Sequence, residues 1–174
     1  MCDNEGGLWF GTFYGGANYL SPVGERFSNY TCHDKEKGFC GNVISRFCED
    51  NNGSLWIASD DGGLNRMSVS SHKFVSYPGS ATLSKYNVHA LCNDGRYLWV
   101  GTYTNGIIRL DKSTGAMKKY TQQQGLYGSS SYAIYKDHNG NIWAATMEGI
   151  NLYDPVKDSF HKICATEVLT IDIK

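Results

Sequence analysis

The stretch Asp50-Asn51-Asn52-Gly53-Ser54-Leu55-Trp56-Ile57-Ala58-Ser59 decides the fold, because variants of it recur along the chain. Residues 3–12, 94–102 and 137–146 repeat its pattern of aspartate, glycine and tryptophan. The four copies use all four tryptophans of the 174 residues, which stand 47, 43 and 44 residues apart. This period is typical of four-stranded propeller blades rather than of helical or leucine-rich solenoids.

Turn residues divide each repeat into strands. In Asp50 to Gly53, aspartate stands first and glycine fourth, as a type I turn prefers. The third repeat shortens this turn to Asp94-Gly95, a tight-hairpin signal. Another glycine, six or seven residues after each tryptophan, marks the next hairpin. We therefore interpret the repeat aspartates as turn formers rather than as catalytic groups.

The sequence thus predicts an all-β chain: a β-propeller fragment of four four-stranded blades, cut out of register with the blades. Fourth strands are expected at aromatic pairs such as Phe27 to Tyr30 and Phe74 to Tyr77, and the strand before each repeat aspartate is assigned to the innermost position. A terminal strand at 168–174 is expected to complete the first blade, within one chain or across a dimer. The repeats cover approximately residues 1–30, 42–77, 87–120 and 131–163.

Because neighbouring propeller sheets pack face to face, the repeated tryptophans are expected to form the structural core between blades. They are Trp9, Trp56, Trp99 and Trp143. An asparagine recurs in the third strands at Asn18, Asn65 and Asn151, where we expect a structural hydrogen bond rather than a ligand contact.

Composition excludes several kinds of partner. Sixteen basic and seventeen acidic residues give a net charge of −1, without a basic stripe for nucleic acid. No apolar run approaches a membrane span and no signal peptide is apparent, so direct membrane contact is not expected. The six cysteines lack zinc-site spacing, and neither a metal nor a cofactor is expected. Cys48 and Cys92 are interpreted as buried strand thiols, while pairing of Cys32 with Cys40 stays open.

The pattern Asp-x-x-Gly-x-Leu-Trp-Ile-Gly-Thr, followed by Gly-Gly-Leu-Asn-Arg and an aromatic near tyrosine, resembles the two-component regulator propeller repeat. The resemblance covers essentially the whole chain and is best from Asp50 to Met67. Ala58-Ser59 and Ala144-Ala145 depart from Gly-Thr, and Thr104-Asn105-Gly106 departs from Gly-Gly.

The resemblance implies the periplasmic sensor region of a hybrid two-component system histidine kinase of Bacteroides-type bacteria. Such regions detect oligosaccharides and signal to a kinase, which has no module in this chain. The remaining blades of a longer parent, or a second copy of this chain in a homodimer, are the expected protein partners.

Ligand contacts are expected in the turns after the tryptophan strands and in the longer connections, where tyrosine rings can stack on sugars and carboxylates or amides can bind hydroxyls. The candidates are Tyr14, Asp60, Asp61, Tyr86, Asn87, His89, Tyr103, Asn105, Tyr127 and Glu148.

Three classes of function stay open. The first is such a non-catalytic sensor segment, and the second is an interaction scaffold without its own ligand. An enzyme acting on polysaccharides is the third class, because fold does not fix chemistry and Asp60, Asp61 and Glu148 can supply acid and base groups. No nucleophile motif, metal triad or phosphate loop accompanies them.

Overall fold

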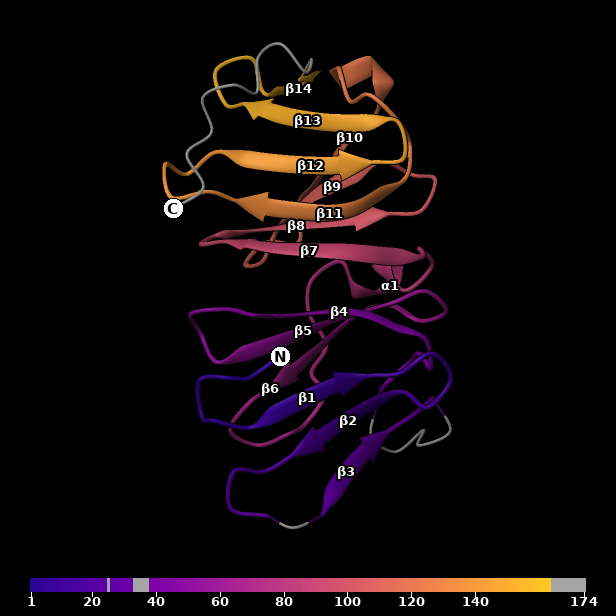
Figure 1. Ribbon diagram of the computed structural model, residues 1–174, viewed down its shortest axis with the longest axis vertical. Coiled ribbons are helices and arrows are strands. Elements are labelled where there is room, and N and C mark those ends of the chain that lie inside the picture. The colour runs from indigo at the N-terminus through magenta and orange to yellow at the C-terminus, as the bar shows by residue number, and fades with distance from the viewer. Residues whose placement is uncertain (25, 33–37, 164–174) are drawn as a thin grey trace.

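The computed structural model describes residues 1–24, 26–32 and 38–163, which form four antiparallel sheets in chain order (Figure 1). The first two sheets contain β1 (Leu8–Gly11), β2 (Ala17–Leu20) and β3 (Phe27–Tyr30), then β4 (Ile44–Glu49), β5 (Ser54–Ser59) and β6 (Gly63–Ser68). The third contains β7 (Val88–Asp94), β8 (Tyr97–Thr102), β9 (Ile107–Asp111) and β10 (Met117–Tyr120). The fourth contains β11 (Ser131–Lys136), β12 (Ile142–Thr146), β13 (Gly149–Asp154) and β14 (Ser159–Lys162).

The first strands of the last three sheets lie side by side. β7 contacts both β4 and β11, whereas later strands of each sheet lead away from this line. This is the arrangement of propeller blades around an axis, with β4, β7 and β11 innermost. The predicted all-β propeller fragment is confirmed, and each repeat corresponds to one sheet.

Two sheets depart from the predicted four strands. In the second, Phe74 to Tyr77 was expected to pair with β6, but only an isolated bridge joins Phe74 to Met67. The chain then turns at Pro78, which has no N–H to donate, into the short helix α1 (Ser80–Leu83). The hydroxyl of Tyr77 donates to the carbonyl of Leu64 at 2.8 Å.

The first sheet has three strands, with β1 at its inner edge. Where the other sheets have an innermost strand, an isolated bridge joins Cys2 to Leu8. The expected terminal strand 168–174 lies outside the described residues.

Three apolar layers hold the sheets together, each built around a tryptophan. Trp9, Trp56 and Trp99 are at most 1% exposed and lie in separate core clusters between consecutive sheets. Tyr77 packs edge-on against Trp56 with ring centres 5.0 Å apart. Trp143, on the last sheet, is half-buried. The predicted packing role is therefore confirmed for the first three tryptophans.

The recurring asparagines fasten the connections between sheets. Asn65 accepts a hydrogen bond from the backbone N–H of Cys40 at 3.1 Å and donates to its carbonyl at 2.6 Å. Asn151 holds the backbone of Tyr127 in the same way, at 2.7 and 3.1 Å. Asn18 instead accepts from the side chain of Asn29. The expectation of a structural hydrogen bond is confirmed.

Candidate functional site

One end of each sheet is occupied by the repeat aspartate, which forms a turn and anchors the tryptophan. Oδ1 of Asp50 accepts the N–H groups of Asn52 and Ser54 at 2.9 and 3.1 Å, while Oδ2 accepts the indole N–H of Trp56 at 2.9 Å. The N–H of Gly53 donates to the carbonyl of Asp50 and closes the predicted turn. Asp3 and Asp137 repeat the indole bond at 2.8 and 2.9 Å.

Lysines of the following sheet reinforce two of these aspartates. Nζ of Lys112 lies 3.3 Å from Oδ2 of Asp50, and Nζ of Lys136 lies 2.5 Å from Oδ1 of Asp94. Burial alone raises the pKa of Asp50, but the hydrogen bonds from Trp56 and the turn, with Lys112, outweigh it and lower that pKa. A carboxylate so fully engaged is a structural group.

At the opposite end, each innermost strand carries a β-bulge in the same place. The register shifts between Ile44 and Arg46 in β4, and β7 and β11 show the same shift. The unpaired bulge residues are Ser45, His89 and Tyr132, each five residues before a repeat aspartate. A bulge re-aims a side chain at a strand end, and bulges are over-represented next to active sites.

Two of these bulge residues meet and form the centre of a polar and aromatic group. The imidazole of His89 stacks on Tyr103 with ring centres 5.6 Å apart and an interplanar angle of 18°. Tyr132 meets the same imidazole edge-on at 5.1 Å. Nε2 of His89 lies 2.5 Å from Oδ1 of Asp60, which comes from the turn after β5. We call Asp60, His89, Tyr103 and Tyr132 the His89 cluster.

The His89 cluster combines exposed rings with polar groups. Tyr103 and Tyr132 are 45% and 43% exposed, so both present ring surface to solvent. Tyrosine rings of this kind can stack on the apolar face of a sugar, while imidazole and carboxylate groups can bind its hydroxyls.

Two buried oxygens at this end of the sheets are unsatisfied within the described part of the chain. Oδ1 of Asp60 lies beside Nε2 of His89 but makes no hydrogen bond, and Oγ of Ser131, beside Tyr132, has no hydrogen-bond partner. Buried oxygens without hydrogen bonds are uncommon and point to strain or to a bound molecule.

The residues expected to bind ligand do not form a single site. Asp60, Asn87, His89 and Tyr103 come together, and the carbonyl of Asn87 accepts the N–H of Tyr103 at 3.0 Å. Tyr86 and Asn105 lie around Lys119, whose Nζ is 5.9 Å from the Tyr86 ring centre and 3.1 Å from Oδ1 of Asn105.

The remaining expected residues lie apart from the His89 cluster. Tyr127 carries Nζ of Lys162 over its ring at 3.8 Å, and exposed Glu148 lies close to Gly128. Tyr14 is 78% exposed beside Phe13.

Asp61 is engaged by its own turn and by the connection before β4. Oδ1 accepts the hydroxyl of Ser59 at 2.6 Å and the N–H groups of Asn42 and Val43 at 2.8 and 3.1 Å. These hydrogen bonds outweigh burial and lower the pKa of Asp61. A carboxylate held by three donors shapes the connection before β4.

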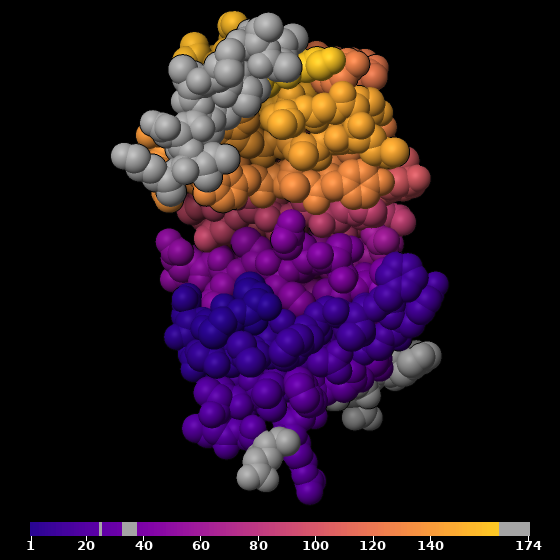
Figure 2. Space-filling model, viewed as in Figure 1, coloured from indigo at the N-terminus to yellow at the C-terminus, as the bar shows by residue number. Residues whose placement is uncertain are grey.

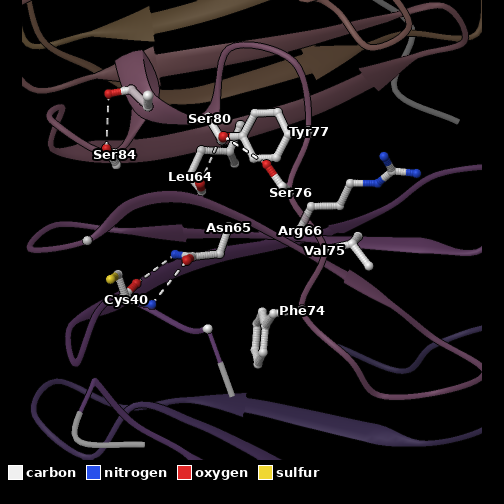
Figure 3. A pocket seen from close by; sticks show the side chains of 13 residues that line it. Cys40, Leu64, Asn65, Arg66, Phe74, Val75, Ser76, Tyr77, Ser80 and Ser84 are labelled. Atoms are coloured by element: carbon white, nitrogen blue, oxygen red, sulfur yellow. Dashed lines mark hydrogen bonds between the residues drawn. The ribbon is translucent and has the colours of Figure 1, made fainter. Parts of the chain in front are cut away.

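A cavity with a volume of about 400 Å³ runs along β6. Figure 3 shows its lining, with Asn65 bonded to Cys40 and the hydroxyls of Ser76, Ser80 and Ser84 around it. It lies where the second sheet lacks its outer strand, so it follows from the irregular path of the chain after Phe74. Within the described residues, no group of His, Cys, Asp or Glu can hold a metal ion.

Fold and site define the class of the protein: a β-propeller whose sheets share one Asp–Trp anchor and present their variable residues at the other end. The family model of the two component regulator propeller matches residues 38–61 and 128–148. The two matched segments lie in the second and fourth sheets.

Two solved structures match most of the chain. The extracellular domain of the hybrid two component system BT3049 of B. thetaiotaomicron matches with a TM-score of 0.79 and 23% identity, over 98% of this chain and 23% of that one. The extracellular domain of BT4673 from the same organism matches with a TM-score of 0.76 and 28% identity, over 96% and 25%. The chain therefore spans about a quarter of the length of these domains.

Other comparisons bear on fold alone. The computationally designed Ika4 protein matches with a TM-score of 0.59 and 12% identity, over 83% of this chain and 82% of that one. None of the curated proteins compared with the chain matches it. In the described part of the chain, the helices are too short to cross a membrane.

Proposed function

We propose that this chain is a non-catalytic part of the periplasmic sensor region of a hybrid two-component system, and that it binds an oligosaccharide and signals to a kinase outside this chain. The family and the extracellular domains it resembles support the sensor role. The single observation that carries the ligand proposal is the His89 cluster, where two exposed tyrosines flank a histidine and a carboxylate.

The charge and shape of the cluster favour an uncharged sugar. Asp60 and His89 already pair with each other, so neither stands alone as a group that would select a charged ligand. Ring faces and hydroxyl-binding groups at one strand end match the alternating apolar and polar surfaces of a pyranose.

Isothermal titration of the chain with a panel of neutral oligosaccharides tests the proposal. Tyr103→Ala and Tyr132→Ala are expected to weaken binding about tenfold, since one stacking contact contributes roughly 1 kcal/mol. His138→Ala changes an exposed aromatic residue in the Asp137 turn, at the opposite end of the strands, and serves as the matched control. Equal weakening by the control, or heat of binding that survives both tyrosine changes, would place the ligand elsewhere.

A scaffold without its own ligand is the second candidate, favoured by the exposed side chains of Phe10 and Phe27, whose rings meet edge-on. It predicts no heat with any sugar of the panel. An enzyme has weaker support, because the Asp61 carboxylate is already engaged by hydrogen bonds from Ser59, Asn42 and Val43.

A further inference from the structure

A cavity lies between the second and third sheets, at the end of the strands that carries the repeat aspartates and opposite to the His89 cluster. The two sheets follow one another along the molecule (Figures 1 and 2). The cavity has a volume of about 140 Å³. Among the described residues that line it are three cations, Arg66, Arg96 and Lys112, but a single carboxylate, Asp50.

Two of the three cations are already paired with a carboxylate. Nζ of Lys112 faces Oδ2 of Asp50 at 3.3 Å. Nε of Arg96 donates to Oδ2 of Asp111 at 2.6 Å, while Oδ1 of Asp111 accepts hydrogen bonds from the turn that follows it. Each acid therefore offsets one cation, and the third cation, Arg66, leaves the cavity with a net positive charge.

The guanidinium of Arg66 is held in place but not neutralised. Its Nε donates to Oγ of Ser54 at 3.0 Å, and its central carbon lies 5.5 Å from the ring centre of Trp56. Within the described residues, both of its Nη groups lack a hydrogen bond and the side chain has no carboxylate partner. A guanidinium fixed in this way presents N–H groups in the fork geometry that binds two oxygens of one anion.

The next repeat shows what an arginine at this position binds. Arg109 stands ten residues after its tryptophan, as Arg66 does, and its Nη1 lies 3.1 Å from Oδ1 of Asp158 in the turn between β13 and β14. The matching place in the turn between β9 and β10 is taken by Gly115. Both residues have a left-handed backbone, with φ of 51° and 75°, four residues after the aspartate that ends the preceding strand. The turn of the third sheet therefore supplies no such carboxylate to Arg66.

We propose that this cavity binds a small oxyanion of the phosphate or carboxylate type, which takes the part at Arg66 that the Asp158 carboxylate takes at Arg109. The Nη groups of Arg66 bond two of its oxygens, and Lys112, whose side chain is 10% exposed, adds a charge that salt screens little. Since one water takes up about 30 Å³ of liquid, the cavity has room for such an ion but not for an oligosaccharide. The site is thus separate from the sugar site proposed above.

Titration of the full chain with inorganic phosphate, followed by the NMR signals of the indole N–H groups, tests the proposal. Trp56 lines the cavity, so its signal should shift and saturate, while that of Trp143 on the last sheet should stay in place. A parallel titration with acetate distinguishes a carboxylate from a phosphate ligand, and saturable binding of either one supports the site. Sodium chloride at equal ionic strength measures the effect of general screening.

Variants of one arginine assign the binding. Arg66→Gln should weaken it about tenfold, the loss expected for one charge-assisted hydrogen bond, whereas Arg66→Lys keeps the charge without the fork and should weaken it less. Arg46→Gln, which changes an exposed arginine of β4 outside the cavity, is the matched control and should bind as the unchanged chain does. Circular dichroism verifies that each variant is folded. A Trp56 signal that saturates with neither anion, an equal shift with chloride, or undiminished binding by Arg66→Gln would overturn the proposal.

Discussion

Replacement of Asp50 by alanine tests whether the repeat aspartate is a structural anchor. Asp50 is 3% exposed and accepts three N–H hydrogen bonds of 2.9 to 3.1 Å, one of them from the indole of Trp56. It also faces Lys112, whose side chain is 10% exposed. Each buried donor left without a partner costs about 1–3 kcal/mol. An unpaired buried charge adds to that cost, so we expect Asp50→Ala to lower the free energy of unfolding by about 3–5 kcal/mol.

The matched variant is Asp94→Ala in the third repeat. There the shortened turn leaves Nε1 of Trp99 3.4 Å from Oδ2 of Asp94, and the side chain of Asp94 is 27% exposed. Its partner Lys136 is 40% exposed, so this ion pair contributes little. We expect Asp94→Ala to lower the free energy of unfolding by about 1 kcal/mol, which is the range of a weak hydrogen bond together with an exposed ion pair.

Urea unfolding followed by tryptophan fluorescence and by circular dichroism measures both losses. The midpoint should fall much further for Asp50→Ala than for Asp94→Ala, with the same dependence on urea. Equal losses in the two variants, or a loss below about 1 kcal/mol for Asp50→Ala, would refute the assignment of the aspartate as an anchor.

Three further predictions follow from single positions. Burial raises the pKa of Asp158, but hydrogen bonds from one lysine and two tyrosines outweigh it and hold that pKa well below its usual range. The ionised Asp158 therefore stabilises the folded chain above about pH 4, and this contribution is lost as pH falls. Asp158→Asn, which tolerates the observed φ of 51°, should cost about 1 kcal/mol at pH 7 and flatten the acid decline of the urea midpoint; an unchanged decline contradicts this. Gly63→Ala places a Cβ 2.1 Å from a carbonyl oxygen and should lower the melting temperature far more than Gly53→Ala, which meets nothing within 4 Å at the same positive φ; equal shifts would be contrary to expectation. Cys32 and Cys40 are free thiols, and burial together with the neighbouring Cys32 raises the pKa of the Cys40 thiol, so a mild oxidant should join the pair, with the loss of two hydrogens in the intact mass; two thiols that remain alkylatable would contradict this.

The repeat made most of the fold predictable. Four evenly spaced tryptophans give the sheet count, and the turn residues give the strand limits within a residue or two. The tryptophan layers follow because stacked sheets must bury their facing residues. What the period cannot report is a local departure, such as the path after Phe74, where Pro78 and the hydrogen bond from Tyr77 to Leu64 replace strand pairing.

The site was only partly predictable. Residue type and position near the connections identified Asp60, His89 and Tyr103 but not Tyr132, although His89 and Tyr132 lie at equivalent bulges of two inner strands. Strand alternation assigns a residue to one face, and a bulge breaks that alternation. The available signal was the shared offset of five residues before each repeat aspartate, which relates Tyr132 to His89. The bond from aspartate to indole was likewise hidden, because it closes only when the turn forms.

The most direct test of the sensor assignment is an NMR titration of the chain with the neutral oligosaccharide that gives the strongest heat in calorimetry. Selective labels on histidine and tyrosine rings report His89, Tyr103 and Tyr132 separately from His138 in the Asp137 turn. The account predicts shifts at the first three, saturating together with the measured heat, and an unmoved His138 signal. Shifts confined to His138, or none in the His89 cluster at saturating sugar, would contradict it.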